Sequence, residues 1–189
     1  MIYEQVALTD AMIPRASAPL LQHLLDTYAS ETNKVATIWR CFEKAEMGYQ
    51  PHLKSTTVLG IMKHQLLSER RFFAEFLSLP EPAADQVLPE GEEPQAYCKQ
   101  LVELAGARLA HLAAKEESWW LEEVPFFDVK RQRVWIFWRR VLHTAHHRTQ
   151  LTGYLRLLEK AVPSTYGPTA DVSWTGADPT KTVAAAGRK

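Results

Sequence analysis

Three of the seven histidines crowd into one turn near the end of the sequence: His143, His146 and His147. Positions i and i+4 of a helix project from the same face, so His143 and His147 could bind one metal ion between them. His146 falls on another line of that helix and is expected to face outward, to support a ligand, or to lie at an interface. The spacing of the pair therefore makes this turn the first candidate for chemistry.

A third ligand must come from elsewhere, because catalytic zinc-like sites commonly use three protein groups and leave one position open for water. His64 is the best candidate, since it lies in a strongly apolar stretch with Gly60 one turn before it and Ser68 one turn after it. These small residues would leave room beside an imidazole ring. The other histidines have loop or more amphipathic surroundings and rank lower: His23, His52 and His111.

The spacing alone is weak evidence, because hydrogen-bonded histidine pairs are commoner than metal sites. Thr144 follows His143 where a zinc protease motif carries its glutamate base, so an ordinary metalloprotease is excluded. Three residues could support the site, although each has a commoner structural role. Glu69 could act as a base or orient a ligand, although a solvated ion pair is its commoner role. Arg140 could place a charge on the ligand face, although a surface or dimer contact is commoner. Tyr154 could take part in the site, although packing is commoner. None of them is assigned a catalytic role.

Prolines and glycines divide the sequence into four long segments with apolar residues at helical spacing. These segments predict helices at about 18–44, 55–79, 94–115 and 130–161. The second is apolar nearly all round and should be largely buried. No stretch alternates convincingly enough to predict a sheet, and no internal repeat is visible. The expected fold is all-α, an up-and-down four-helix bundle.

We expect a single domain over residues 1–174 and a disordered tail over residues 175–189, which are small, polar and rich in alanine. Residues 166–174 carry enough aromatic and turn residues to dock on the domain. The segment 80–94 could be a lid or a connection between helices. Its proline and acidic content favours the connection.

Composition and charge exclude several classes of function. The 22 basic side chains balance 22 acidic ones, so no basic surface is expected to attract nucleic acid or an anionic membrane. The most apolar stretch, residues 134–142, is short and contains arginines, so no transmembrane helix is expected. Cys41 and Cys98 stand far apart in a chain that shows no secretory leader, which is typical of a reduced, cytoplasmic protein.

Aromatic residues concentrate around the connection between the third and fourth expected helices. They are Trp119, Trp120, Phe126, Phe127, Trp135, Phe137 and Trp138. Core packing is their commoner role. The alternative is a subunit interface or an apolar substrate pocket, where large aromatic side chains are enriched.

The last expected helix and its end carry a resemblance to a known family. Residues 141–158 read VLHTAHHRTQLTGYLRLL and residues 162–171 read VPSTYGPTAD. In the second expected helix, IMKH at 61–64 is followed by ERRFF at 69–73. These stretches resemble the corresponding parts of DinB proteins, and the resemblance is weakest in the third helix and absent from the tail.

The resemblance implies a four-helix bundle, usually a homodimer, with a nickel, zinc or iron ion bound by one histidine of the second helix and two of the fourth. At the matching positions this chain has His64, His143 and His147. The family often has glutamate after the first ligand of the fourth helix, where this chain has Thr144. Any supporting role of that side chain is therefore open.

Three imidazoles without a thiolate or carboxylate would preserve the charge of the ion, lower the pKa of a bound water or thiol, and leave a position open for a small-molecule substrate. Relatives in the superfamily include thiol-dependent transferases and isomerases. By analogy, we expect a metal-dependent enzyme of the thiol-dependent transferase or hydrolase type, with a small cellular thiol as co-substrate.

The alternative is a non-catalytic, dimeric stress-response protein that binds metal or serves as a scaffold. A closed site with a fourth protein ligand would indicate the scaffold, and an open site an enzyme.

Overall fold

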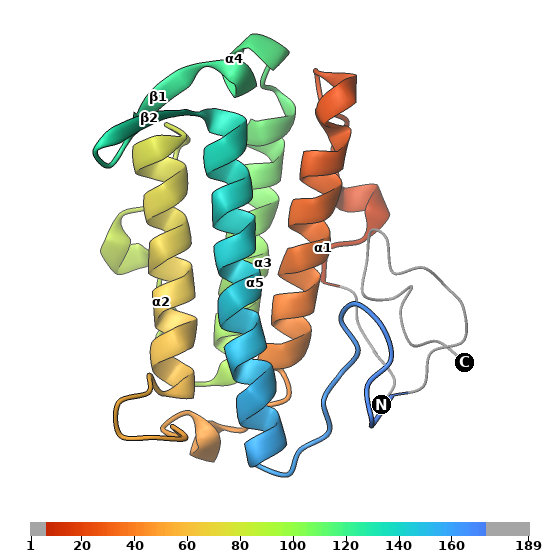
Figure 1. Ribbon diagram of the computed structural model, residues 1–189, viewed down its shortest axis with the longest axis vertical. Coiled ribbons are helices and arrows are strands. Elements are labelled where there is room, and N and C mark those ends of the chain that lie inside the picture. The colour runs from red at the N-terminus through yellow and green to blue at the C-terminus, as the bar shows by residue number, and fades with distance from the viewer. Residues whose placement is uncertain (1–6, 173–189) are drawn as a thin grey trace.

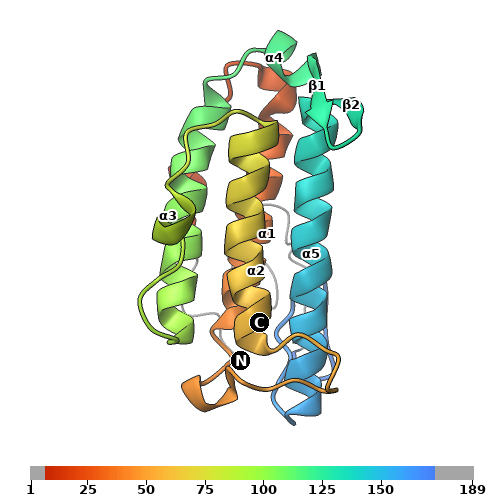
Figure 2. The same ribbon diagram turned by 90° about the vertical axis from the view of Figure 1, so that its left-hand side faces the viewer.

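Four long helices lie side by side in the computed structural model of the protein (Figures 1 and 2). The structure describes residues 7–172. The long helices are α1 (Gln22–Trp39), α2 (Val58–Arg71), α3 (Pro94–Ala113) and α5 (Arg133–Leu157). α1 packs against both α3 and α5, and α2 packs against α5. No helix within the described range has the combined length and apolar character of a membrane span.

Shorter elements connect or extend the long helices. They are η1 (Asp10–Met12), η2 (Pro19–Leu21), η3 (Lys44–Glu46), η4 (Phe72–Phe76), η5 (Ala84–Gln86), α4 (Glu117–Leu121), β1 (Glu123–Phe126) and β2 (Val129–Gln132). η4 is a π-helical turn that continues α2, and the other η elements are 3₁₀ turns. The short helix α4 and the two strands stand between α3 and α5, at one end of the long helices (Figure 1).

All four segments predicted to be helical contain a long helix, but each helix is shorter than its prediction. α2 begins at Val58 rather than near Ser55, because the Thr57 hydroxyl caps it by accepting a hydrogen bond from the backbone N–H of Gly60. α5 begins at Arg133 because the preceding residues form β2. The helix ends are therefore decided by caps and by strand pairing, which apolar spacing does not reveal.

A two-stranded antiparallel sheet shows that the prediction of a chain without strands was wrong. β1 and β2 pair from Glu123 opposite Gln132 to Phe126 opposite Val129. Only Val124 and Phe126 point into the protein, and every residue of β2 is exposed. Strands of four residues with so little burial give almost no alternating pattern, so the sequence offered no clear signal.

The aromatic cluster serves mainly as core. Trp120, Phe126 and Phe137 are buried, whereas Phe127 and Trp135 are largely exposed. Phe126 contacts the rings of Phe72 and Phe76, and Trp120 contacts Phe137. Packing is thus the role of the buried members, whereas the exposed and partly buried ones, Trp138 among them, keep surface that a ligand or partner could contact.

The apolar core has two parts with buried charged residues between them. The part near the strands includes Phe73, Trp120 and Phe137, and the other includes Trp39, Leu66 and Leu151. Along α1, α2 and α5, the residues Glu31, Glu69 and Arg148 fall between members of the two parts. We call the buried charged residues at this level the charged layer: Glu31, Lys34, Glu69, Arg108, Arg140 and Arg148.

Arg108 joins three segments in the charged layer. Its guanidinium, on α3, forms salt bridges with Glu81 (Nε to Oε1, 2.6 Å) and with Glu69 of α2 (Nη1 to Oε2, 2.9 Å), and donates to the Tyr28 hydroxyl of α1. The Glu81 side chain is only 2% exposed, although it belongs to the segment between α2 and α3. This segment is therefore fixed to the helices, as suits a connection better than a lid.

Removing Glu81 should destabilise the protein strongly, because it leaves part of a buried guanidinium uncompensated. We expect Glu81→Ala to lower the free energy of unfolding by about 3 kcal/mol, measured by urea denaturation. Glu75→Ala is the control, since Glu75 forms an exposed pair with Arg71 and should cost less than about 1 kcal/mol. Equal losses in the two variants would contradict the anchoring role of Glu81.

Candidate metal centre

The packing of α2 against α5 brings His64, His143 and His147 together. One ring nitrogen from each lies within 4.8 Å of the other two. Among the described residues they form the group of potential ligands that could hold a metal ion. The Nε2 atoms of His143 and His147 are 3.3 Å apart. The cluster is open to solvent, because His64 is exposed and the other two are half-buried.

The small neighbours of His64 have other roles than the sequence suggested. A Cβ atom on Gly60 would come within 2.7 Å of Thr56 Cγ2 and 3.1 Å of the capping Thr57 hydroxyl, so glycine is needed for the start of α2. Ser68 accepts a hydrogen bond from Arg140 at 2.8 Å. Neither residue therefore serves merely as space beside the imidazole.

A chain of hydrogen bonds fixes the ring protons of two histidines. Arg140 can only donate, so its Nη1 donates to His143 Nδ1 at 2.9 Å, which places the proton of the neutral His143 ring on Nε2. His147 Nδ1 donates to Gln150 Oε1 at 2.6 Å, which leaves His147 Nε2 as an acceptor. The His143 Nε2–H group then points to His147 Nε2. The four side chains thus form one consistent row of donors and acceptors.

The surroundings keep the three rings neutral. Burial is the main cause that lowers the pKa of each histidine, and the Arg140 cation adds to it at all three. The effect is largest for His143, where burial, Arg140 and then His147 lower the pKa to about 3. Neutral imidazole is the form that binds metal ions, so the site holds its ligands in the required protonation state at neutral pH.

Arg140 is buried rather than a surface charge, contrary to the commoner role that the sequence suggested. Besides His143, it donates to Ser68 and to the Thr144 hydroxyl at 3.0 Å, and its Nε lies 3.8 Å from Glu69 Oε1. Thr144, the residue after His143, thus helps to hold this guanidinium. Glu69 is also buried and paired with arginines, so the solvated ion pair considered for it was wrong.

The remaining candidates lie outside the cluster. The Tyr154 hydroxyl donates to the Thr56 carbonyl at 2.9 Å, and the ring packs against Tyr49, which is the packing role. His146 is exposed as expected, with its ring centroid 5.0 Å from that of His147. His23 stacks on Trp138, on a different part of the surface. These positions exclude them from the three-nitrogen cluster.

The donor set fits a divalent transition metal. Two nitrogens that bind one tetrahedral ion at about 2.0–2.1 Å stand about 3.3–3.4 Å apart, close to the separation of the His143 and His147 Nε2 atoms. His147 already presents a free Nε2, oriented through Gln150. Ligation by His143 Nε2 requires its proton to leave that atom and Arg140 to give up its hydrogen bond to Nδ1. Imidazole ligands suit zinc, nickel and iron.

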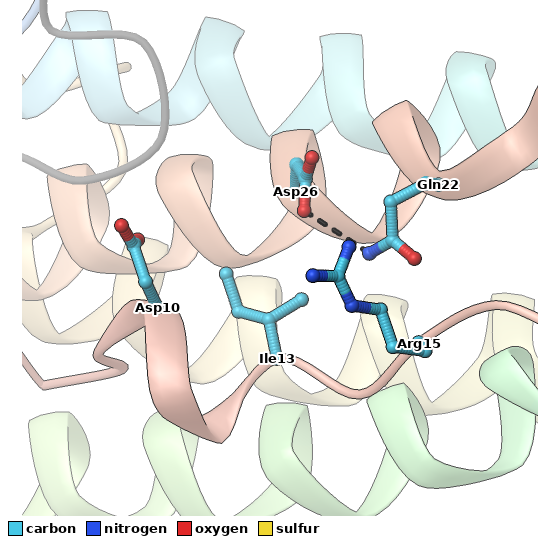
Figure 3. Close-up of a pocket in the computed structure, with 5 residues that line it drawn as sticks. All are labelled: Asp10, Ile13, Arg15, Gln22 and Asp26. Carbon is cyan, nitrogen blue, oxygen red and sulfur yellow. Dashed lines mark hydrogen bonds between the residues drawn. The ribbon is translucent and has the colours of Figure 1, made fainter. Parts of the chain in front are cut away.

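A separate hollow of about 160 Å³ lies where the N-terminal segment meets the start of α1 (Figure 3). Its lining is Asp10, Ile13, Arg15, Gln22 and Asp26, and Gln22 donates to Asp26 at 3.2 Å. No histidine lines it. This hollow is therefore not part of the candidate metal centre.

Comparison with known proteins identifies the family. The sequence model of the DinB family matches residues 14–178, so the chain belongs to the DinB family. A DinB-like protein from Bacillus subtilis has a similar solved structure, with 21% identity, 76% of this chain and 96% of that chain covered, and a TM-score of 0.61. A second, from Bacillus cereus, has 15% identity, coverage of 75% and 94%, and a TM-score of 0.62. These structures show a shared DinB-like fold. No curated protein matches the chain.

The hydrogen-bond row predicts different ring tautomers for two neighbouring histidines. In the metal-free protein at neutral pH, His143 should carry its proton on Nε2 and His147 on Nδ1. The reason is that Arg140 donates to His143 Nδ1, whereas Gln150 accepts from His147 Nδ1. Proton–nitrogen correlation NMR of the imidazole rings measures this directly, with exposed His146 as the reference. A proton on Nδ1 of His143 would contradict the arrangement.

Proposed function

We propose that the protein binds one divalent metal ion through His64, His143 and His147 and acts as a metal-dependent enzyme of the thiol-dependent transferase or hydrolase type. The observation that carries this proposal is the approach of three neutral imidazoles from two helices to within 4.8 Å. Zinc, nickel and iron are the candidate ions. Bound there, the ion would supply Lewis-acid chemistry and lower the pKa of a thiol or water.

The protein's own side chains have definable parts in this function. Gln150 orients His147, and the charged layer holds Arg140 beside His143. Arg140 is a fixed cation next to the site, so it favours an anionic reactant such as a thiolate over a neutral one. The exposed side of the cluster at His64 gives a small substrate access to the ligands.

An enzyme is favoured over the alternative, a non-catalytic dimeric stress-response protein whose ion ties two helices together. A structural site is closed by a fourth protein ligand, whereas the cluster found among residues 7–172 consists of three histidines. The Glu69 carboxylate of the charged layer is engaged by Arg108 and Arg140. The fourth position is thereby left to water, a thiol or a substrate.

The remaining expectations belong to the same proposal. The four long helices would form the up-and-down four-helix bundle of a single domain over residues 1–174, assembled as a homodimer that works in the cytoplasm with a small thiol as co-substrate. Tyr166 supports docking of the segment after α5, since its hydroxyl donates to Glu31 of α1 at 2.7 Å. Trp174 and the tail from residue 175 lie outside the described residues.

Elemental analysis of the purified, untagged protein tests the metal site. We expect about one divalent ion per chain, lost in both His64→Ala and His147→Ala because each variant removes one of three ligands. His146→Ala is the matched control, since it removes an exposed histidine from the same turn of α5 and should retain the ion. An ion that persists in both ligand variants would refute the site.

The same preparations separate the enzyme from the scaffold. The loaded protein should accelerate the attack of a small thiolate on an electrophile such as chlorodinitrobenzene, in which a C–S bond replaces the C–Cl bond and chloride leaves, and the two ligand variants should not. Loaded protein that binds its ion but leaves the rates of thiol transfer and ester hydrolysis unchanged would favour the non-catalytic alternative.

Gln150 should strengthen metal binding by fixing the ring of His147. We expect Gln150→Leu to weaken the affinity for zinc by about tenfold, measured by competition with a chelating dye, because partners of ligating histidines typically contribute at least that much. Thr149→Ala is the control, since Thr149 is also exposed and bonds only to its own helix at Ala145. Unchanged affinity in Gln150→Leu would exclude this role.

A further inference from the structure

A second pocket, of about 290 Å³, opens between α1 and α5. At 100° per residue, its α5 lining lies roughly opposite His143 and His147 on that helix. Its lining is Thr27, Ser30, Glu31, Lys34, Trp138, Val141, Leu142, Ala145 and Tyr166. This volume is just below the lower limit of the range for small-molecule sites, which is about 300–1,000 Å³. The pocket is therefore separate from the metal centre and large enough for a small ligand.

The walls that α5 contributes are apolar. Val141 is buried, Trp138 and Ala145 are partly buried, and Leu142 is 63% exposed at the mouth. An exposed leucine beside a tryptophan offers apolar surface that a ligand can remove from water. The body of a suitable ligand should therefore be aromatic or aliphatic.

The opposite wall, on α1, has one buried polar group without a partner and one whose donors are only partly used. Ser30 is 1% exposed, and its hydroxyl has no hydrogen-bond partner among the described residues. The Lys34 side chain is 5% exposed, and its ammonium has one hydrogen bond, to Glu31 at 2.7 Å. Buried polar groups are normally paired, so these spare donors point to a ligand with acceptor atoms.

The charged cluster beside the pocket, Glu31 and Lys34 of its lining with Arg148 of α5, has an excess of positive charge. Glu31 is paired with both Lys34 and Arg148 at 2.7 Å, so one carboxylate faces two cations. The Tyr166 hydroxyl also donates to Glu31, and the Tyr166 ring lies 4.1 Å from Lys34 Nζ and 4.6 Å from the Arg148 guanidinium carbon. A single negative charge on a ligand would neutralise the cluster.

We propose that the α1–α5 pocket binds a small organic anion, a carboxylate or sulfonate with an apolar body. Its anionic group accepts hydrogen bonds from Lys34 and Ser30, and its apolar body packs against Trp138 and Leu142. The site is independent of the histidine cluster, so it holds an effector or a second small molecule rather than the reactant at the metal.

Anilinonaphthalene sulfonate is the probe, because it combines one negative charge with an aromatic body and its fluorescence rises in apolar surroundings. We expect the full-length protein, stripped of metal by a chelator, to bind one dye per chain saturably. The uncharged analogue phenylnaphthylamine should bind at least about tenfold more weakly, as suits the loss of a charge-assisted hydrogen bond. Loading with zinc should leave the dye affinity unchanged.

Substitutions at the mouth locate the dye without disturbing the core. Leu142→Glu should weaken dye binding about tenfold or more by repelling its charge, and Leu142→Gln should weaken it less. Leu157→Glu is the matched control, because Leu157 is 61% exposed on the same helix and lies outside the pocket. Lys34→Met should abolish the preference for the charged dye, and circular dichroism checks that this variant folds.

Three results would overturn the proposal. The first is equal affinity for the charged and uncharged probes. The second is an equal effect of Leu142→Glu and Leu157→Glu. The third is a protein that binds no dye and that Leu142→Glu converts from dimer to monomer in analytical ultracentrifugation, since this face would then be an interface between two copies of the chain.

Discussion

The rest of the structure depends on one constraint, which is the pairing of the charged side chains that are buried between the two parts of the apolar core. An arginine removed from water must meet carboxylates at hydrogen-bond distance, because an uncompensated buried charge costs several kcal/mol. Arg108 of α3 meets Glu69 of α2 and Glu81 of the connecting segment, and Arg148 of α5 meets Glu31 of α1. Apolar side chains tolerate sliding of one helix along another better than these pairs do. The charged layer therefore fixes how far α1, α2, α3 and α5 are shifted along one another.

The candidate metal centre is built on the edge of this layer. Arg140 approaches Glu69 on one side and donates to His143 on the other, so the position of a ligand ring depends on a buried ion pair. Ligating histidines usually donate their second N–H to an acceptor, and His147 does so to Gln150. His143 meets a cation instead. The two ligands of α5 are thus unequal, with His147 ready to bind and His143 dependent on a shift of its proton.

α5 connects the two sites that the structure suggests. One face of the helix carries His143 and His147 toward α2, and the roughly opposite face carries Trp138, Leu142 and Ala145 toward α1. Arg148, on the same helix, belongs to the charged pair beside the α1–α5 pocket. A ligand in that pocket would contact the helix that supplies two of the three histidines.

The sequence by itself determined the four helical segments and the two histidines of one helix face, because apolar spacing and i, i+4 geometry are local properties of the chain. It also favoured His64 as the third member of the cluster, on the resemblance to DinB proteins and on the expectation of a largely buried helix. That expectation was wrong, because α2 buries fewer than half of its residues and exposes His64. Only the tertiary structure decided that Glu69 and Arg140 are buried, that Gly60 serves a helix cap, that a short sheet precedes α5, and that Ser30 and Lys34 face a pocket. The partners of these residues lie on other helices or across a turn. Charge pairing and desolvation depend on distances in space, which the spacing of residues along one helix does not contain.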